Sequence, residues 1–458
     1  MEHTIAAIAT GQSAAAIGIV RLSGEECFAV IDKIFTAMDK RKITQRESHT
    51  LALGWITDPK TGERVDQVLV SVMRGPNSYT GEDVCEINCH GGLYVMRRIL
   101  QICLENGAHL AQPGEFSKRA FLNGKIDLTQ AEGIIDLIDS GTRASSMAAL
   151  SQVEGHIGRA IKNLREELIE KLAFILVNIE YPEEEDLQEP TEAQILKDLE
   201  NIGGRLQSLY DSYEQGRILK DGVSTAIVGS PNVGKSSILN VLAGYERAIV
   251  TDIEGTTRDI LTEQINLGNI RLNISDTAGI RTSGDTVERI GVEKAIQQIE
   301  RSELVLFVVD GARPLQENDY VIMERLKEKR VICLINKSDL RKTIDESYIL
   351  SNFKHVVYFS AATSTGYEAL TKTVEEMFAC SSQDVWQSEI LASARQRNGV
   401  HHAILALQQA KGGLEGGFGA DIVTIDLQNA IDALGEITGE KASEDVLREI
   451  FSRFCLGK

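Results

Sequence analysis

Long apolar runs are missing from this chain of 458 residues. A helix that crosses a bilayer needs about 20 consecutive apolar residues, and the longest run here, Leu172–Ile179, is interrupted by an asparagine. The first ten residues contain no basic stretch followed by an apolar one, so they do not form a secretory signal. We therefore expect a cytoplasmic protein that does not contact a membrane.

Cysteine is also scarce, with seven residues scattered along the chain. An odd number in a chain of this length fits reduced thiols better than disulfide bridges. Cys85, Cys89 and His90 lie close enough in sequence to suggest a metal site, but no second cysteine pair accompanies them. We interpret these two cysteines as buried thiols that pack in a core.

Basic residues are outnumbered, because 48 Lys and Arg face 67 Asp and Glu, for a net charge of −19. This charge argues against a protein that coats nucleic acid by bulk attraction. The surplus of acidic residues is unevenly distributed along the chain. Residues 1–124 contain 13 basic and 14 acidic residues, so nearly all of the surplus lies after residue 124. Any contact with RNA must therefore use local basic patches.

The hydrophobic and charged fractions, 43% and 25%, are those of a folded protein, and the length predicts two or three domains. Residues 1–118 mix β-rich runs, such as Ile17–Leu22 and Gln67–Met73, with short helices such as Gly92–Glu105. This mixture predicts an N-terminal α+β domain.

From about Gly124 the pattern becomes helical, and an acidic turn at Tyr181–Pro190 separates two helices. The apolar residues of the first helix step by three and four and so share one face. They are Ile157, Ile161, Leu164, Leu168, Leu172, Ile175 and Ile179. The second helix carries the same spacing from Ile195 to Tyr213.

From Val223 strand-like runs alternate with helical ones, which is typical of βαβ units around a mainly parallel sheet. After about Cys380 the pattern is helical again, interrupted by a glycine-rich loop at Gly412–Gly419. We therefore predict a multidomain α/β protein: an α+β domain (1–118), a discontinuous helical domain (119–221 and 381–458) and an inserted doubly wound domain (222–380).

The run Ser224–Val228 leads into Gly229–Ser236, followed by the helical run Ser237–Leu242. The segment GSPNVGKS is a GxxxxGK[ST] phosphate-binding loop in the strand–loop–helix context that it requires. Its glycines let backbone N–H groups turn toward phosphates, Lys235 reaches the β- and γ-phosphates, and Ser236 binds Mg²⁺. This context disfavours the alternative, a glycine turn with a stray lysine.

Three further segments, each after a strand-like run, narrow the nucleotide to GTP. In Asp276–Gly279 the aspartate can hold Mg²⁺ through water and the glycine can sense the γ-phosphate. In Asn336–Asp339 a carboxylate can accept two hydrogen bonds from guanine, a pattern that adenine does not offer. Ser360 and Ala361 would support the base. A surface Asn-Lys-Ser-Asp alone is commonly a turn, but four such segments in order are a strong signal.

Residues 222–380 thus resemble a Ras-like GTPase domain of the translation-factor class. The predicted nucleotide-binding residues are Asn232, Val233, Gly234, Lys235, Ser236, Ser237, Thr251, Asp252, Ile253, Glu254, Gly255, Thr256, Thr257, Asp276, Thr277, Ala278, Gly279, Asn336, Lys337, Asp339, Ser360 and Ala361. Thr257 is the predicted second magnesium ligand.

Activation of the attacking water must differ from the Ras pattern. Ras-like enzymes place a glutamine after Asp-x-x-Gly, but this chain has Ile280, which neither donates nor accepts a hydrogen bond. The following segment offers Asp285, Glu288 and Arg289 as polar candidates.

Asn232 suggests a second departure from that pattern. Its amide, beside the carbonyl groups of Thr251 and Ile253, could coordinate a monovalent cation where other GTPases use an arginine finger. From spacing alone the alternative, that Asn232 only caps the loop, stays open.

Several short segments outside the nucleotide motifs carry a second resemblance. They are Gly18–Gly24, Ser78–Asp83, Cys89–Gly92, Pro113–Ser117, Arg119–Lys125 and the terminal Phe454–Lys458. Together with the nucleotide motifs they make the chain resemble, from end to end, the MnmE (TrmE) family of bacterial tRNA-modification GTPases.

The resemblance implies an N-terminal domain that forms a homodimer and binds 5-formyltetrahydrofolate or a related one-carbon folate. The implied folate contacts are Arg21, Glu82, Lys125 and Lys458. From the residues alone, Arg21 and Lys125 could instead form surface ion pairs. The implied potassium ligands are Asn232, Thr251, Ile253 and Thr256, and the implied magnesium ligands are Ser236 and Thr257.

The resemblance also implies a reaction and a partner. Glu288 would position the attacking water, and with the FAD- and NADH-dependent protein MnmG, in a heterotetramer, the family adds an aminomethyl-type (carboxymethylaminomethyl) group to carbon 5 of the wobble uridine of certain tRNAs. The catalytic candidates are Glu288, Lys235 and, as a hypothesis, Cys455. From sequence alone Cys455 is either a poised thiol or, by default, a packing residue.

Two other functions share the nucleotide motifs. A ribosome-assembly GTPase that binds ribosomal RNA usually carries a compact basic domain after the GTPase domain, whereas the residues after Cys380 are helical here. A regulatory GTPase would only switch partners, and loss of its gene would leave the nucleosides of bulk tRNA unchanged.

Overall fold

The computed structural model describes residues 3–11, 13–180, 192–245, 263–274, 288–378, 389–416 and 420–458. The chain divides into two compact units. One contains residues 1–135, 152–199 and 402–458, and the other contains residues 136–151 and 200–401. The predicted domain boundaries at 118, 221 and 380 stay predictions. Within the described residues no helix is long and apolar enough to cross a membrane.

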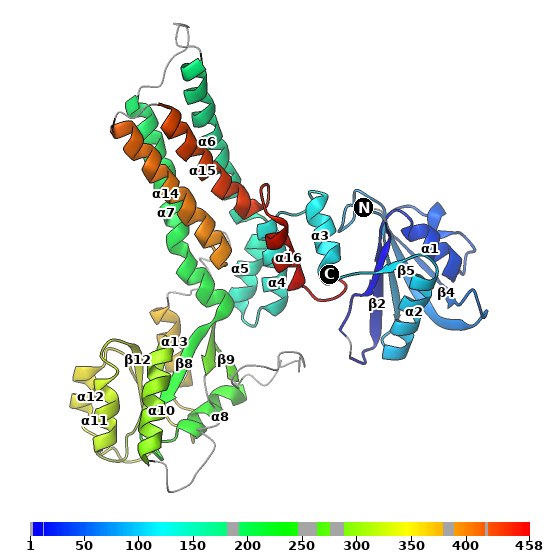
Figure 1. The fold of residues 1–458 in the computed structure, drawn as a ribbon. Coiled ribbons are helices and arrows are strands. Elements are labelled where there is room, and N and C mark those ends of the chain that lie inside the picture. Colours follow the sequence, from blue (N-terminus) through cyan, green and yellow to red (C-terminus); the bar gives the residue numbers. More distant parts are fainter. Residues whose placement is uncertain are drawn as a thin grey trace. The chain divides into compact units, whose positions relative to one another are not determined.

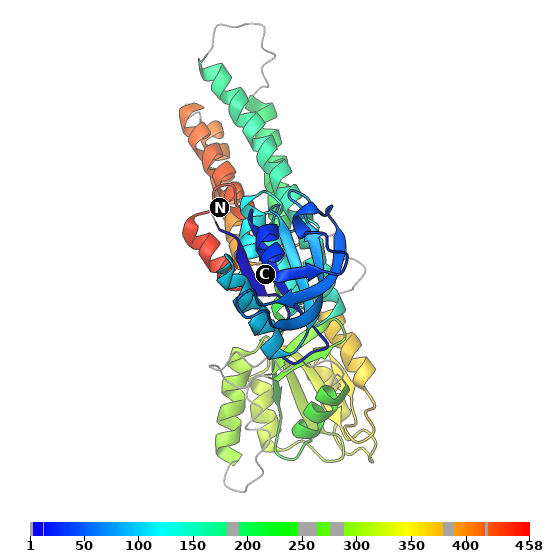
Figure 2. The same cartoon turned by 90° about the vertical axis from the view of Figure 1, so that its right-hand side faces the viewer.

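The N-terminal part contains a sheet of seven described strands in the order β3-β4-β5-β6-β2-β1-β7. The strands are β1 (Ile5–Ile8), β2 (Ile17–Ser23), β3 (Phe35–Ala37), β4 (Thr50–Thr57), β5 (Arg64–Met73), β6 (Val84–His90) and β7 (His109–Leu110), with a 3₁₀ turn η1 (Ile43–Gln45). Neighbouring strands are antiparallel except β1 and β7. Figure 2 shows this sheet in blue and cyan. The predicted α+β domain is confirmed.

The core of this part lies between the sheet and helices α1 (Cys27–Ile34) and α2 (Leu93–Glu105). Residues alternate along β5, so that Val68, Val70 and Val72 are buried. Cys85 and Cys89 are buried in the same core, as predicted, and no cluster of three metal-ligating side chains occurs among the described residues.

The helical part contains α3 (Glu115–Leu122), α4 (Leu128–Asp139), α5 (Arg143–Val153), α6 (His156–Glu180), α7 (Glu192–Asp221), α14 (Ala394–Glu415), α15 (Ala420–Thr438) and α16 (Glu444–Ser452). The predicted apolar face of α6 is buried from Ile157 to Ile175, and α6 runs beside α15 in both views (Figures 1 and 2). The predicted acidic turn Tyr181–Pro190 lies outside the described residues.

One prediction in the helical part was wrong. The glycine-rich segment expected to form a loop from Gly412 is helical through Glu415, as the end of α14. A Cβ at Gly413 would lie 3.3 Å from a methyl carbon of Val423 on α15, so glycine permits close packing of the two helices there. Residues 417–419 of the predicted loop lie outside the described residues.

The inserted part has a sheet of six described strands in the order β13-β12-β11-β8-β10-β9. The elements are β8 (Val223–Val228), α8 (Lys235–Tyr245), β9 (Glu263–Leu267), β10 (Ile270–Ile274), α10 (Glu288–Arg301), β11 (Leu304–Asp310), α11 (Glu317–Glu324), β12 (Arg330–Asn336), α12 (Glu346–Asn352), β13 (Val356–Tyr358) and α13 (Tyr367–Met377). All pairs are parallel except β9 and β10. The predicted inserted doubly wound domain is confirmed.

Apolar clusters cover both faces of this sheet, with α8 and α13 in one and α10 and α11 in the other. The strand order places the carboxyl ends of β8, β11 and β12 side by side. In open sheets of this kind, ligands bind at that edge.

Candidate nucleotide and folate sites

The phosphate-binding loop connects β8 to α8, as predicted. Gly229 and Gly234 have φ angles of +154° and +100°, which disfavour a side chain. Asn232 also has a positive φ of +62°, in the left-handed region that asparagine tolerates better than most residues. Ser236 and Ser237 lie in the first turn of α8, and the N-terminal turn of a helix favours an anion.

Lys235 folds back over its own loop. Its Nζ donates to the carbonyl oxygens of Gly229 and Ser230, at 2.8 and 2.9 Å. Burial lowers the pKa of this ammonium group from its ordinary value. The lysine charge is therefore held at the centre of the loop.

Asn336 joins the phosphate loop to the predicted base-binding segment. Its buried amide Nδ2 donates to the carbonyl oxygen of Val233 at 2.8 Å, and its Oδ1 accepts from the backbone N–H of Ala361 at 3.2 Å. Ser360 Oγ donates to the carboxylate of Asp339 at 2.6 Å. Five predicted residues thus converge near the carboxyl ends of β8 and β12.

Lys337 connects the same two loops on the outer side. Its Nζ donates to the carboxylate of Asp310 at 2.6 Å and to the carbonyl oxygen of Asn232 at 3.3 Å. Asp310 ends β11 and is buried, and it also accepts from the backbone N–H of Ala312 at 2.9 Å. Lys337 is thereby fixed beside the phosphate loop.

Two buried carboxylates of this site were not predicted from the sequence. Asp310 orients Lys337, and Asp319 of α11 accepts a hydrogen bond from the hydroxyl of Ser230 in the phosphate loop. Asp319 also accepts from the backbone N–H of Gln316 at 2.9 Å, which fixes its rotamer. An acidic residue at the end of a strand-like run could have identified Asp310 from the sequence, whereas no local pattern identifies Asp319.

Several predicted site residues lie outside the described residues. They are Thr251, Asp252, Ile253, Glu254, Gly255, Thr256, Thr257, Asp276, Thr277, Ala278 and Gly279. Glu288 is the first residue of α10, and its side chain is also outside the described part.

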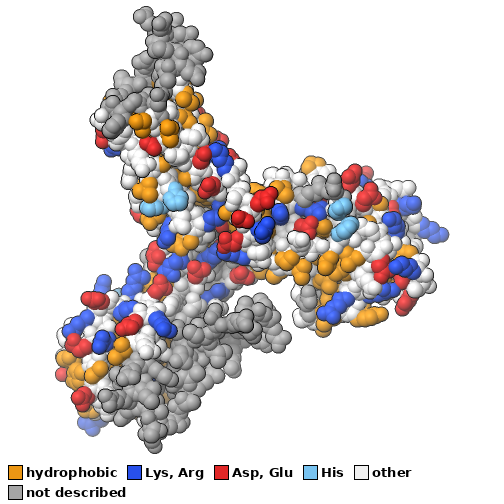
Figure 3. Space-filling model, viewed as in Figure 1, with side chains coloured by type: hydrophobic (Ala, Val, Ile, Leu, Met, Phe, Trp, Pro, Cys, Tyr) orange, Lys and Arg blue, Asp and Glu red, His pale blue; other side chains and the backbone are white. Residues whose placement is uncertain are grey.

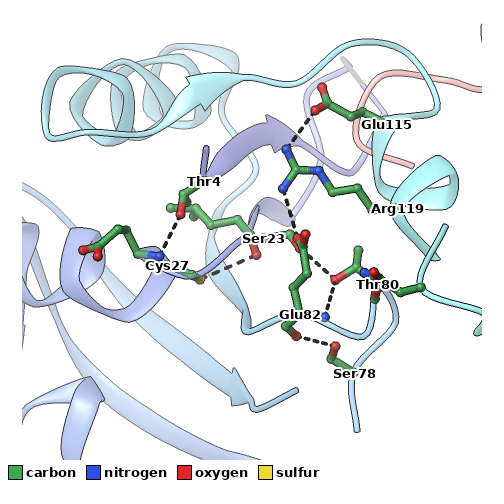
Figure 4. A network of polar contacts seen from close by, with 11 residues as sticks. Thr4, Ser23, Cys27, Ser78, Thr80, Glu82, Glu115 and Arg119 are labelled. Carbon is green, nitrogen blue, oxygen red and sulfur yellow. Dashed lines mark hydrogen bonds and ion pairs between the residues drawn. The ribbon is translucent and has the colours of Figure 1, made fainter. Parts of the chain in front are cut away.

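A second group of polar residues lies in the N-terminal part, around Glu82 (Figure 4). The Glu82 carboxylate accepts from Ser23 Oγ at 2.8 Å and from the guanidinium of Arg119 at 3.0 Å. Arg119 is 3% exposed and also pairs with Glu115 at 2.9 Å. Two buried groups thus fix the orientation of Glu82. The sequence did not predict Arg119, because only the fold brings it to Glu82.

Arg21 brings the two ends of the chain together. Its guanidinium pairs with Glu86 at 2.8 Å and donates to the carbonyl oxygen of Gly457 at 3.1 Å. Burial, followed by the nearby Arg21 charge, lowers the pKa of Lys458. The two predicted folate contacts Arg21 and Lys458 therefore lie close together. The alternative for Arg21, an ion pair, therefore describes one of its contacts, the pair with Glu86.

The predicted folate contact Lys125 and the catalytic candidate Cys455 are exposed. Lys125 Nζ donates to the carbonyl oxygen of Pro76 at 3.0 Å, on the segment that leads to Glu82. Cys455 is exposed, so its default interpretation as a packing residue was wrong. The neighbouring Phe454 and Gly457 are buried and anchor the tail, which leaves the thiol outside.

Comparisons with known proteins agree over the whole chain. Residues 4–125 match the model of the GTP-binding protein TrmE N-terminus, and residues 128–455 match that of the MnmE helical domain. A tRNA modification GTPase MnmE of Acetivibrio thermocellus is 46% identical over 100% of this chain and 99% of that protein. One of Thermoanaerobacter pseudethanolicus is 44% identical over 99% of both chains. Among solved structures, Era of Aquifex aeolicus is 27% identical, with a TM-score of 0.26 over 41% of this chain and 67% of that chain.

Proposed function

Because the chain belongs to the MnmE family of tRNA modification GTPases, we propose that it binds GTP on the loop Gly229–Ser236 and hydrolyses it to GDP and phosphate as part of tRNA modification. The buried amide of Asn336 carries this proposal, since it ties the phosphate loop to the segment at Ala361. A nucleotide whose phosphates and base are held by one rigid frame is positioned for reaction.

We assign guanine recognition to Asp339. The Ser360 hydroxyl occupies only part of the hydrogen-bonding capacity of this carboxylate, which has two oxygens and about four acceptor positions. The remaining positions can accept from the two adjacent donors on the guanine edge. Asp339→Asn replaces one acceptor by a donor, so we expect it to weaken GTP binding by at least about 10-fold, in line with a lost charge-assisted hydrogen bond.

We propose Ser236 and Thr257 as magnesium ligands and Asn232, Thr251, Ile253 and Thr256 as potassium ligands. The Asn232 side chain is exposed and has no hydrogen-bond partner among the described residues, so its amide oxygen is accessible to a cation. When bound, Mg²⁺ and a monovalent cation supply positive charge beside the β- and γ-phosphates. Lys235 contributes its own charge from within the loop.

Glu288 is our proposed water-positioning residue. It begins α10 and follows the Asp-x-x-Gly segment, where Ile280 cannot hydrogen-bond to water. Glu288→Ala should leave GTP affinity close to normal and lower the hydrolysis rate by about 10²-fold or more, as expected for a group that acts on the transition state.

The first experiment compares GTP hydrolysis in potassium and sodium chloride at equal ionic strength. Strong stimulation by potassium, lost in Asn232→Ala, supports the cation assignment. Equal hydrolysis rates in both salts would contradict the assignment of potassium ligands but not the assignment of GTP hydrolysis. Hydrolysis that survives in Glu288→Ala would show that another group positions the water.

We further propose that the N-terminal part binds 5-formyltetrahydrofolate or a related one-carbon folate through Arg21, Glu82, Lys125 and Lys458, and that the protein acts as a homodimer. Two neighbouring cations suit the carboxylate tail of a folate, and a carboxylate fixed by Arg119 suits its ring donors. Equilibrium dialysis with wild type and Glu82→Gln tests this, and undiminished binding by the variant would exclude Glu82.

The tRNA reaction that we propose is addition of an aminomethyl-type group to carbon 5 of the wobble uridine, together with the FAD-dependent MnmG in a heterotetramer. The exposed thiol of Cys455 is available for a direct role. The test is the nucleoside content of bulk tRNA from a strain that lacks the gene, complemented with wild type or Cys455→Ser. Unchanged nucleosides in the deletion strain would contradict the modification, and full rescue by Cys455→Ser would exclude the thiol.

A further inference from the structure

Basic residues gather in and against the loop Asp39–Arg46, between β3 and β4. Five basic residues stand against three acidic ones, Asp32, Asp39 and Glu47. The basic residues are Lys40, Arg41, Lys42 and Arg46 of the loop and Arg74, which bonds to its backbone. Because residues 1–124 are nearly neutral and the whole chain carries −19, this concentration is a local exception.

The backbone of this loop is fixed from two sides. The Asp32 carboxylate of α1 accepts from the backbone N–H of Ile43 at 2.6 Å and from the Thr44 hydroxyl at 2.7 Å. The Arg74 guanidinium donates to the carbonyl oxygens of Thr44 and Arg46 at 2.8 to 3.0 Å. Ile43 is fully buried between these anchors. The loop therefore presents its cations on a preformed support.

Three neighbouring cations of the loop are accessible to solvent. Lys40, Arg41 and Lys42 are exposed, and Lys40 and Lys42 have no ion-pair partner among the described residues. Asp39 pairs with both Arg41, at 3.0 Å, and Arg46. One carboxylate thus serves two guanidinium groups, and the net charge of the loop stays positive. Figure 3 shows Lys and Arg side chains interspersed with Asp and Glu side chains over the N-terminal part.

We propose that the loop Asp39–Arg46 is a docking surface for the phosphate backbone of tRNA. The proposal rests on the tRNA function proposed above. In a strongly acidic protein, RNA contact requires a local cationic surface, and adjacent lysine and arginine side chains match the spacing of a polyanion. The loop contains no aromatic residue to stack on a base, so it positions the RNA without reading its sequence.

An anionic membrane is the competing polyanion, and the loop fits it less well. Surface helices and loops that hold to lipid combine cations with exposed apolar side chains. Ile43, the one large apolar residue of the loop sequence, is buried in the core. Only Met38, directly before the loop, adds an exposed apolar side chain, and a single such group is a weak anchor in lipid.

The test measures the affinity of the full-length protein for purified tRNA over a series of potassium chloride concentrations. The association constant K falls with salt, and each lost phosphate contact reduces the steepness of log K against log salt concentration by about 0.7 to 0.9. For Lys40→Ala/Arg41→Ala/Lys42→Ala we expect the slope to fall by about two units and the affinity at low salt to fall by about 10-fold or more. Substrate and non-substrate tRNAs should lose affinity equally, because phosphate contacts carry no sequence information.

A matched control and a variant of opposite sign separate this surface from general charge and from misfolding. Lys197→Ala/Lys354→Ala/Lys372→Ala removes the same charge from exposed positions on other elements and should leave the slope unchanged. Asp39→Asn removes the carboxylate that Arg41 and Arg46 share, so tRNA should bind a few-fold more tightly. Basal GTP hydrolysis should stay at the wild-type rate in all three.

Three outcomes would overturn the proposal. Equal slopes for wild type and the loop variant, with tRNA bound by both, would exclude this surface but leave the tRNA function intact. If the loop variant lost binding to phosphatidylglycerol vesicles but bound tRNA like the wild type, the loop would be assigned to a membrane. Failure of the wild type to bind tRNA at any salt concentration would remove the proposed tRNA function and the surface with it.

Discussion

At the scale of single residues, the nucleotide site depends on buried amide and carboxylate groups rather than on exposed charge. Asn336, Asp310 and Asp319 are each at most 8% exposed, and each bridges two segments. A buried polar group that loses its partner cannot recover a hydrogen bond from water. Substitution of one of these residues therefore disturbs two loops at once.

Asn336→Ala is the sharpest test of this arrangement. It leaves the carbonyl of Val233 and the N–H of Ala361 without the partner that the amide provides, at a cost of about 1 to 3 kcal/mol in folding free energy. We expect a lower unfolding temperature and weaker GDP binding, measured by calorimetry. Asn352→Ala is the control, because the exposed Asn352 bonds only within the end of α12 and its neighbour Ser351. Equal losses in both variants would contradict the bridging role.

The buried thiols of the N-terminal core predict how stability depends on pH. Burial raises the pKa of Cys89 to about 11 and of Cys103 to about 12, whereas an unfolded thiol ionises near pH 8.5. Between the unfolded and the folded pKa values, the unfolded state binds fewer protons than the folded state. The free energy of unfolding that the neutral buried thiols contribute is therefore fully present below about pH 8.5 and is lost as the pH rises toward 12.

Chemical denaturation at pH 8 and pH 10 measures this loss. Cys103→Ala removes the more strongly shifted thiol, so the free energy of unfolding of this variant should fall less between the two pH values than that of the wild type. The same fall in both proteins would show that Cys103 contributes nothing to the pH dependence.

At the scale of elements, the terminal tail is held by the close approach of its backbone to β1. Gly457 has a φ of +92°, and a Cβ there would lie 2.3 Å from the carbonyl oxygen of Ile8. This geometry excludes any side chain at 457 without displacement of the tail. The carbonyl group of Gly457 in turn accepts from Arg21.

Gly457→Ala should therefore detach the tail from Arg21. We expect 5-formyltetrahydrofolate binding to fall by about 10-fold, since the strain of such a backbone position is about 1 to 3 kcal/mol, and GTP hydrolysis to stay unchanged. Leu456→Ala, at the exposed neighbouring position, is the control. Folate affinity that is equal in wild type and Gly457→Ala would separate the tail from the site.

The elements themselves were largely predictable from the sequence, because each depends on local spacing. The face of α6, the alternating strands of the inserted domain and the loop before Lys235 all carry short-range patterns. The end of α14 was mispredicted, since two glycines favour a loop locally, and the contact with Val423, which accounts for Gly413 in the helix, depends on a distant segment. Asp319 and Arg119 were not predicted as site residues for the same reason. Their partners, Ser230 and Glu82, lie 89 and 37 residues away in the chain.

At the scale of the whole molecule, the chain passes between the two units four times, and each passage falls inside a described helix. The passages lie in α4, α5, α7 and α14. Each unit has its own apolar clusters. We therefore expect each unit to show its own response to a ligand that it binds.

GDP should stabilise the unit with residues 200–401 more than the other. At a concentration about 100 times its dissociation constant, a ligand adds about 2.7 kcal/mol to the unit that binds it. The fluorescence of Trp55 in a Trp386→Phe variant reports the N-terminal part alone, and calorimetry reports both. A calorimetric transition that moves upward while the Trp55 transition stays in place supports separate units, and equal movement of the two would contradict them.

The contact between Gly234 and Asn336 has a consequence for how this sequence can change over time. A Cβ at Gly234 would lie 2.2 Å from the Asn336 amide nitrogen, so neither residue tolerates a larger neighbour. These two positions, far apart in the chain, are therefore expected to change together rather than singly. A mutational library that varies position 234 while Asn336 is held constant should contain few active clones, and paired substitutions at 234 and 336 should recover more.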